Sequence, residues 1–143
     1  MATRKQTTHI IIHCSATPPS MDIGAREIDK WHRQRGFLKI GYHFVIRRSG
    51  EIEFGRKVDE PGAHCKYQNG TSVGICLVGG VKEDKKTPEE NFTEDQWWAL
   101  KKVISDLRRR YPHAQIAGHN EFDKGKACPS FNVQTHPLLK EFQ

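Results

Sequence analysis

The residues best suited to chemistry lie in one short stretch near the C-terminal end of the chain. Segment Ala117–Ser130 contains an imidazole at His119 and a thiol at Cys128, with Lys126 two positions before the thiol. Neutral imidazole and thiolate are both good ligands for zinc. Cys128 precedes a proline, which favours extended backbone, and residues two apart in extended chain point to the same side. We therefore expect an ammonium group beside a metal-binding sulfur, which suits a reaction that develops negative charge on oxygen.

A metal site needs at least one more protein ligand, and His13 is the best candidate. It ends the β-branched run 9–13, which is typical of a buried strand, and turn-forming residues follow it. Folds of the α/β class tend to place their sites at such strand ends. A hydrogen-bonded core histidine is the alternative interpretation of His13. Two imidazoles and one thiolate would leave a fourth position on zinc, which is the pattern of catalytic rather than structural zinc.

The remaining patterns predict the elements that must position these side chains. Hydrophobic periodicity and turn residues predict strands at 9–13, 41–48, 51–54, 72–79 and 114–117, helices from 22 or 24 to 35 and from 93 to 111, and terminal helical turns at 137–142. Strands and helices thus alternate, with one hairpin. This pattern predicts a single α/β domain, over residues 9–143, with a central mixed β-sheet flanked by helices. The polar residues 1–8 predict a flexible N-terminal arm.

The longest predicted helix has a clear start and a clear buried face. Thr93 and Gln96 form a capping box. Apolar side chains then recur at helical spacing on one face, at Trp97, Leu100, Ile104, Leu107 and Tyr111. We expect this stripe to cover the sheet, with Trp98 at its exposed edge.

Other polar side chains have weaker claims to a role. Tyr42 falls at the first position of strand 41–48, beside a glycine, where it could overhang a cleft or be an ordinary half-buried tyrosine. His64 lies in the loop 55–71, and loops carry function more often than their share. We expect His32 to be partly exposed, and Cys14 to pack in the core.

Composition limits the class of protein. The chain has 143 residues and a formal charge of +6. Nucleic acid, an anionic cell envelope and a merely solvated basic surface all fit this charge, but direct nucleic-acid binding has only the charge in its favour, so we do not expect it. No apolar run approaches the roughly 18 residues of a membrane span, and no secretory signal is visible. We therefore expect synthesis in a cytoplasm, where the four cysteines would be reduced.

Six segments, taken together, make the chain recognisable. They are Ile11–Thr17, Arg26–Ile28 with Trp31–His32, Gly41–Phe44, Gly74–Gly80, Gly118–His119 and Lys126–Phe131. This combination resembles the zinc-dependent N-acetylmuramoyl-L-alanine amidases of the phage lysozyme, or endolysin, type, which are related to peptidoglycan recognition proteins. The resemblance runs in family order across nearly the whole chain and implies the fold of that family.

The resemblance also implies the roles of individual residues. His13, His119 and Cys128 fall where the family binds one zinc ion per chain. Tyr42 and Lys126 fall where it keeps two residues that are needed for catalysis but not for metal binding. The implied reaction is hydrolysis of the amide bond between N-acetylmuramic acid and L-alanine in bacterial peptidoglycan. An enzyme with this activity would lyse the host cell.

Further expectations concern His64, partners and location. His64 lies in a loop that borders the substrate groove in relatives, so we expect it to bind substrate. Some close phage relatives also bind and restrain the phage RNA polymerase, which makes that polymerase a second expected partner beside peptidoglycan. We expect a monomer that is made in the host cytoplasm and acts in the periplasm after release. The alternative is a non-catalytic peptidoglycan-binding protein with structural zinc, which needs a fourth ligand such as His9 or His64.

Overall fold

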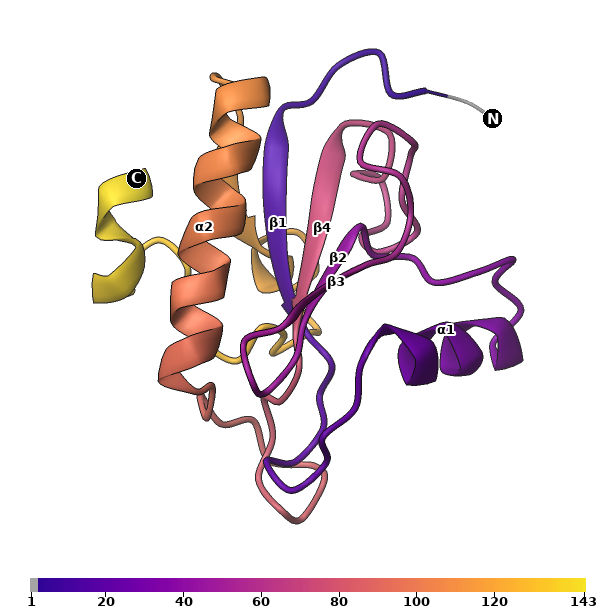
Figure 1. Cartoon of the computed structure of the whole chain (residues 1–143), viewed down its shortest axis with the longest axis vertical. Helices are drawn as coiled ribbons and strands as arrows, with labels where there is room; N and C mark the ends of the chain where they lie inside the picture. The colour runs from indigo at the N-terminus through magenta and orange to yellow at the C-terminus, as the bar shows by residue number, and fades with distance from the viewer. Residues whose placement is uncertain (1–2) are drawn as a thin grey trace.

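A five-stranded mixed sheet forms the centre of the structure, a computed structural model that describes residues 3–143 (Figure 1). In spatial order its strands are β3 (Ile52–Phe54), β2 (Phe44–Ile46), β4 (Ser72–Leu77), β1 (His9–Cys14) and β5 (Gln115–Gly118). Strands β2, β4, β1 and β5 pair in parallel, whereas the hairpin strand β3 runs antiparallel to β2. The prediction of an α/β fold with a mixed sheet and one hairpin is confirmed.

Strand β1 is an inner strand of the sheet, because it pairs with β4 on one side and β5 on the other. Its β-branched side chains suit this fully buried position, and Ile10, Ile11 and Ile12 have no exposed surface. Side chains alternate between the two faces of a strand. Ile10 and Ile12 belong to the larger core cluster, so His13 points to the opposite face.

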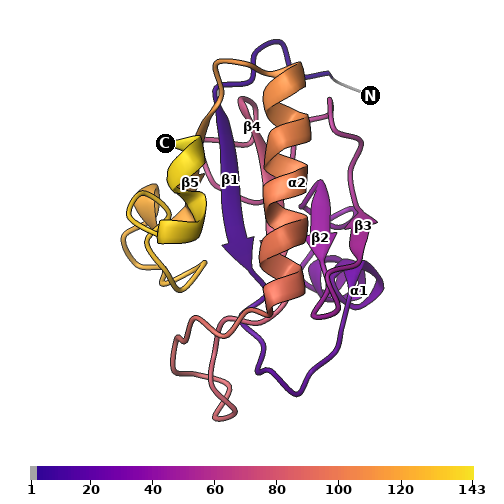
Figure 2. The same cartoon turned by 60° about the vertical axis from the view of Figure 1, so that its left-hand side comes forward.

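The two α-helices lie on opposite faces of the sheet. Helix α2 (Glu94–Arg110) covers the face that carries Ile10 and Ile12, and in Figure 2 it runs alongside β1, between β1 and β2. The predicted stripe is confirmed, because the side chains of Trp97, Leu100, Ile104 and Leu107 are all buried. Burying each such side chain contributes roughly 1.5–3 kcal/mol. Helix α1 (Ala25–Gln34) packs on the other face through Ile28.

The capping box of α2 also fastens the helix to the sheet. Thr93 Oγ1 accepts a hydrogen bond from the Gln96 backbone, and Gln96 Oε1 accepts one from the Thr93 backbone, as predicted. The amide nitrogen of Gln96 then donates to the carbonyls of Ile46 and Val78, at 3.1 and 2.8 Å. Gln96 is completely buried. One side chain therefore starts the helix and fixes it to the ends of two strands.

The predicted strand 41–48 is longer than the observed β2. The Gly41 backbone nitrogen donates to the His32 ring at 2.9 Å, and the Tyr42 carbonyl accepts from Arg56. These bonds take the backbone before Phe44 out of the regular sheet ladder. Tyr42 therefore precedes β2 and is not its first residue.

The two ends of the chain pack against the core. The structure describes residues 3–8 of the predicted N-terminal arm 1–8. Within this segment, the Arg4 side chain is buried. Its guanidinium donates to the Glu60 carbonyl, the Tyr111 hydroxyl and Thr7. The flexibility of this segment in solution stays a prediction. At the other end, the expected helical turns are present as the 3-10 helix η2 (Pro137–Phe142).

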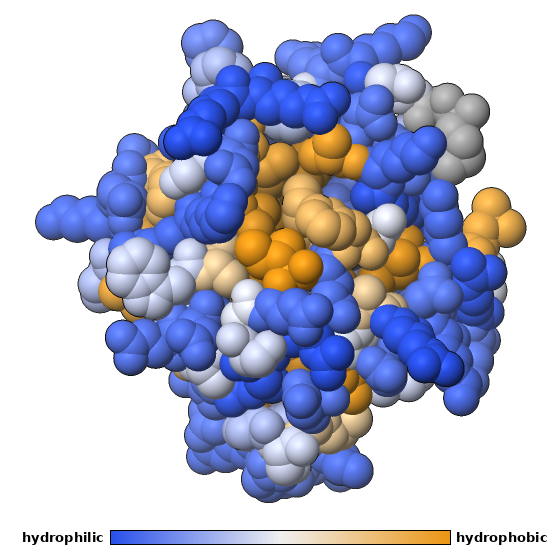
Figure 3. All heavy atoms as spheres, in the orientation of Figure 1, coloured by the Kyte–Doolittle hydropathy of each residue, from blue (hydrophilic) through white to orange (hydrophobic). Residues whose placement is uncertain are grey.

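The face of the molecule shown in Figure 3 is mostly hydrophilic, with apolar side chains gathered near its middle. Within residues 3–143, no helix combines the length and the apolar character that crossing a membrane requires.

Candidate metal centre

Three side chains from separate elements meet at one edge of the sheet. His13 lies in β1, His119 opens the short 3-10 helix η1 (His119–Glu121) directly after β5, and Cys128 lies in the loop beyond. One ligand atom from each of the three lies within 4.8 Å of the other two. Strands β1 and β5 are parallel neighbours, so their C-terminal ends lie side by side. The convergence that the sequence predicted is therefore present.

Backbone hydrogen bonds close the loop between His119 and Cys128. The Asn120 backbone nitrogen donates to the Cys128 carbonyl at 2.8 Å, and its side-chain amide donates to the Phe131 carbonyl at 3.3 Å. The Cys14 backbone nitrogen donates to Cys128 Sγ at 3.2 Å. The end of β1 thus holds the sulfur in place beside His13.

The two histidines are in the form that binds metals. His13 is completely buried, and burial lowers its pKa well below the usual value. Burial also lowers the pKa of His119; Asp123 opposes this effect, and the Lys126 ammonium adds to it. Both rings are therefore neutral at neutral pH. His13 Nδ1 lies 3.8 Å from Cys128 Sγ, whereas its Nε2 lies 2.8 Å from His64 Nδ1.

The thiol needs a cation before it can lose its proton. The pKa of the Cys128 thiol lies well above the usual value, mainly because of a hydrogen bond with Cys14 and, to a smaller extent, because of burial. A metal ion would supply the missing positive charge, because metal binding and thiol deprotonation are linked. Two neutral imidazoles and one such sulfur fit zinc.

The candidate ligand set contains three protein residues, not four. Among residues 3–143, no other histidine, cysteine or carboxylate joins the group. His9, one of the two fourth ligands that we considered, is hydrogen-bonded to Thr8 and packs edge-on against Phe122. His64, the other, contacts the far nitrogen of His13. This arrangement fits an open site better than a closed structural one.

Tyr42 and Lys126 line the same hollow as the candidate ligands His119 and Cys128, and this hollow has a volume of about 490 Å³. The Tyr42 ring lies 5.0 Å from the His13 ring. Burial raises the pKa of the Tyr42 phenol well above the usual value, so the phenol keeps its proton and can donate it in a hydrogen bond. Lys126 is exposed at the rim. The structure thus brings together all five residues for which the sequence predicted metal binding or catalysis.

His64 also borders the hollow, but its side chain is buried. Its Nδ1 lies 2.8 Å from His13 Nε2, and its Nε2 lies 3.2 Å from Ser72 Oγ. The substrate-binding role expected for His64 stays a prediction. Nothing in the spacing of residues 13, 64 and 72 pointed to these contacts, because they depend on how the loop folds back over β4.

The expected exposure of His32 is wrong. His32 is only 7% exposed, and it lines the hollow with its ring 5.4 Å from the Tyr42 ring. Its Nδ1 accepts the hydrogen bond from Gly41 that fixes the chain before Tyr42. The sequence did contain a signal, because His32 follows Ile28 by four residues and so shares its buried helical face. Cys14 is buried as expected, and in addition it contacts Cys128.

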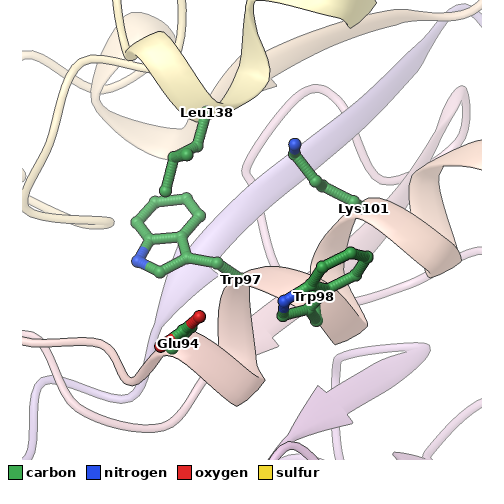
Figure 4. A pocket seen from close by; sticks show the side chains of 5 residues that line it. All are labelled: Glu94, Trp97, Trp98, Lys101 and Leu138. Atoms are coloured by element: carbon green, nitrogen blue, oxygen red, sulfur yellow. The ribbon is translucent and has the colours of Figure 1, made fainter.

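A second hollow lies over α2, on the face of the sheet opposite to His13 (Figure 4). The tryptophan rings of Trp97 and Trp98, together with Leu138, form its apolar lining, and Glu94 and Lys101 are its charged members. It contains no histidine or cysteine, so it offers none of the ligands that distinguish the first hollow.

Comparisons with known proteins agree with this geometry. The family described as "N-acetylmuramoyl-L-alanine amidase" matches residues 3–131. The endolysin of Enterobacteria phage K11 is 50% identical over 131 residues, which cover 92% of this chain and 85% of that protein. A solved endolysin amidase from Clostridium intestinale is 25% identical, with a TM-score of 0.80 over 99% of this chain and 90% of that one.

A solved Drosophila peptidoglycan recognition protein, PGRP-LB, is also 25% identical, with a TM-score of 0.79 over 96% of this chain and 85% of that one. The resemblance seen in the sequence is therefore confirmed for both the amidases and the recognition proteins. Because the family match covers most of the chain, the protein belongs to the N-acetylmuramoyl-L-alanine amidase family.

Proposed function

We propose that the protein is a zinc-dependent N-acetylmuramoyl-L-alanine amidase that acts as a phage endolysin on bacterial peptidoglycan. The observation that carries the proposal is the group of His13, His119 and Cys128, whose ligand atoms lie within 4.8 Å of one another. His119 and Cys128 line a hollow together with Tyr42 and Lys126, and His13 is buried behind it. The family match and the phage endolysins among the relatives support the amide bond as the target.

Neighbouring residues hold two of the proposed ligands in place. His13 is fixed from behind by His64, and Cys128 by the Cys14 backbone. A zinc ion held by these residues would supply Lewis-acid activation of the scissile carbonyl.

Lys126 and Tyr42 supply electrostatic stabilisation. The Lys126 ammonium lies at the rim, where it can face the negative charge that develops on the carbonyl oxygen during attack by water. The protonated Tyr42 phenol can donate a hydrogen bond to the same oxygen or orient the attacking water.

A non-catalytic peptidoglycan-binding protein with structural zinc is the alternative. It would need a fourth protein ligand, and the described residues offer three. The interaction with phage RNA polymerase stays a prediction that rests on the resemblance alone.

Product analysis tests the proposal. Purified peptidoglycan is incubated with the protein, and new N-terminal alanine and new reducing sugar ends are both measured, with and without a zinc chelator. We expect alanine amino groups to appear without reducing ends, and the chelator to abolish their release. Reducing ends without alanine would identify a glycosidase instead, and absence of both products would favour the binding protein.

A further inference from the structure

A chain of hydrogen bonds leads from the protein backbone to Nε2 of His13, the ring nitrogen farther from Cys128. The Ser72 hydroxyl lies 2.6 Å from the Gln68 carbonyl, His64 Nε2 lies 3.2 Å from Ser72 Oγ, and His64 Nδ1 lies 2.8 Å from His13 Nε2. Ser72 and His13 have no exposed surface, and His64 has little. Water therefore has little access to these three groups, and each must find its partner within the chain.

The carbonyl at the start of this chain fixes the direction of every proton in it. A carbonyl can only accept, so the single hydroxyl proton of Ser72 points to Gln68. Ser72 Oγ must then accept from His64, which places the His64 proton on Nε2 and leaves a lone pair on Nδ1. That lone pair accepts a hydrogen bond from His13 Nε2, so the ring proton of His13 lies on Nε2. His13 Nδ1, the nitrogen nearer to Cys128, is left with its lone pair free.

The His64 ring is held in a slot made by two glycines. A Cβ at Gly62 would lie 2.5 Å from the ring, and a Cβ at Gly74 would lie 2.6 Å from it. The loop on which His64 lies is fixed as well, because Asn69 Oδ1 accepts from the backbone nitrogens of His64 and Cys65, at 2.8 and 2.9 Å. The ring is therefore positioned by packing and by its backbone, besides its own hydrogen bonds.

We propose that His64, fixed by Ser72, is a positioning residue that selects the His13 tautomer whose Nδ1 lone pair faces the metal. The proposal rests on the zinc site of the proposed function and assigns to His64 a role other than direct contact with substrate. Both ring nitrogens of His64 are engaged inside the protein, so neither is left for a hydrogen bond to a ligand in the hollow. Partners behind a metal-bound histidine set its orientation and basicity, and their loss typically weakens metal binding about 10–100-fold.

Two substitutions of nearly equal shape separate the hydrogen bond from the packing. His64→Asn keeps an acceptor oxygen at the position of Nδ1, whereas His64→Leu places a methyl group there. Zinc affinity is measured for both by competition with a chelator, beside the wild type and His136→Leu. His136 is a half-buried histidine that stacks on Trp97, on the face with α2, and it serves as the control. Thermal unfolding of each variant shows whether it folds.

We expect His64→Leu to bind zinc about 10–100-fold more weakly than the wild type, and His64→Asn and His136→Leu to bind it nearly as well. Equal affinities in the Leu and Asn variants would overturn the role of His64. A wild type that binds no zinc would instead overturn the proposed function, so the two failures are distinguishable.

A measurement on the wild type alone covers the case in which a variant fails to fold. Nitrogen-15 NMR of the metal-free protein, with labelled histidine, reports which ring nitrogen of His13 carries the proton. We expect the proton on Nε2 of both His13 and His64. A proton on Nδ1 of His13 would contradict the proposal, whatever the variants do.

Discussion

Gly74→Ala should impair the metal centre without touching any residue that binds the metal. Gly74 lies in β4 directly beneath the His64 ring, and an added Cβ would lie 2.6–2.8 Å from three of its atoms. Gly62 bounds the ring as well, with its own Cβ position 2.5 Å from the ring. The ring cannot avoid the new methyl group by a small tilt within this slot.

The structure sets the size of the effect. Ordinary contact begins at 3.4 Å, so the ring has to move by about 0.8 Å. Its bond to His13 is 2.8 Å long, and hydrogen bonds of this kind are lost beyond about 3.2 Å. We therefore expect zinc affinity to fall by about 10–100-fold. Crowding of this kind should also lower the free energy of unfolding by about 1–3 kcal/mol.

Gly70→Ala is the matched control, because no atom lies within 4 Å of its Cβ position and Gly70 belongs to the same loop-to-strand segment. Both variants and the wild type are compared by chelator competition for zinc and by chemical denaturation. Gly70→Ala should match the wild type in zinc affinity. If Gly74→Ala is destabilised but binds zinc as tightly as Gly70→Ala does, the link from His64 to the metal is refuted.

Three further predictions follow from the site. Cys128→Ser should lose both zinc and amidase activity, because a hydroxyl is a poor substitute for thiolate; full zinc content in purified Cys128→Ser would show that the ligand assignment is wrong. Lys126→Ala should keep its zinc but lose about 10²–10³-fold in kcat, as is typical when one electrostatic donor to an oxyanion is removed; an unchanged kcat would exclude its role. Burial lowers the pKa of His43 from 6.5 to about 4, so the fold holds this ring neutral. The resulting stability is complete above pH 6.5, and about 3 kcal/mol of it is lost as the pH falls to 4. Chemical denaturation at pH 7.5 and at pH 4 should show that the free energy of unfolding falls less in His43→Asn than in the wild type. An equal fall in both proteins would mean that other groups cause the acid sensitivity.

The sequence predicted the sheet and its covering helix well, because their signals are local and strong. Three consecutive isoleucines before His13 are typical of a strand buried on both faces. The capping box at Thr93 and the apolar stripe behind it define a helix with one buried side. Two of the three candidate ligands could be found for a related reason, since His13 lies near the end of β1 and His119 directly follows β5, whereas Cys128 lies further along, in the loop after η1.

The missed features depend on contacts between distant segments. The exposure of His32 is decided by the backbone at Gly41, which bonds to its ring. The later start of β2, at Phe44 rather than at Gly41, has the same cause. The link from Ser72 through His64 to His13 needs a loop that folds over two glycines, and no local pattern encodes that approach.

Stepwise addition of zinc to chelator-stripped protein tests the central claim most directly. Bound zinc and the rate of N-terminal alanine release from peptidoglycan are measured in the same samples. We predict that activity is absent without zinc and rises in proportion to occupancy until one ion is bound per chain. Full activity in the stripped protein, or activity that does not follow the first bound ion, would contradict a catalytic metal at His13, His119 and Cys128.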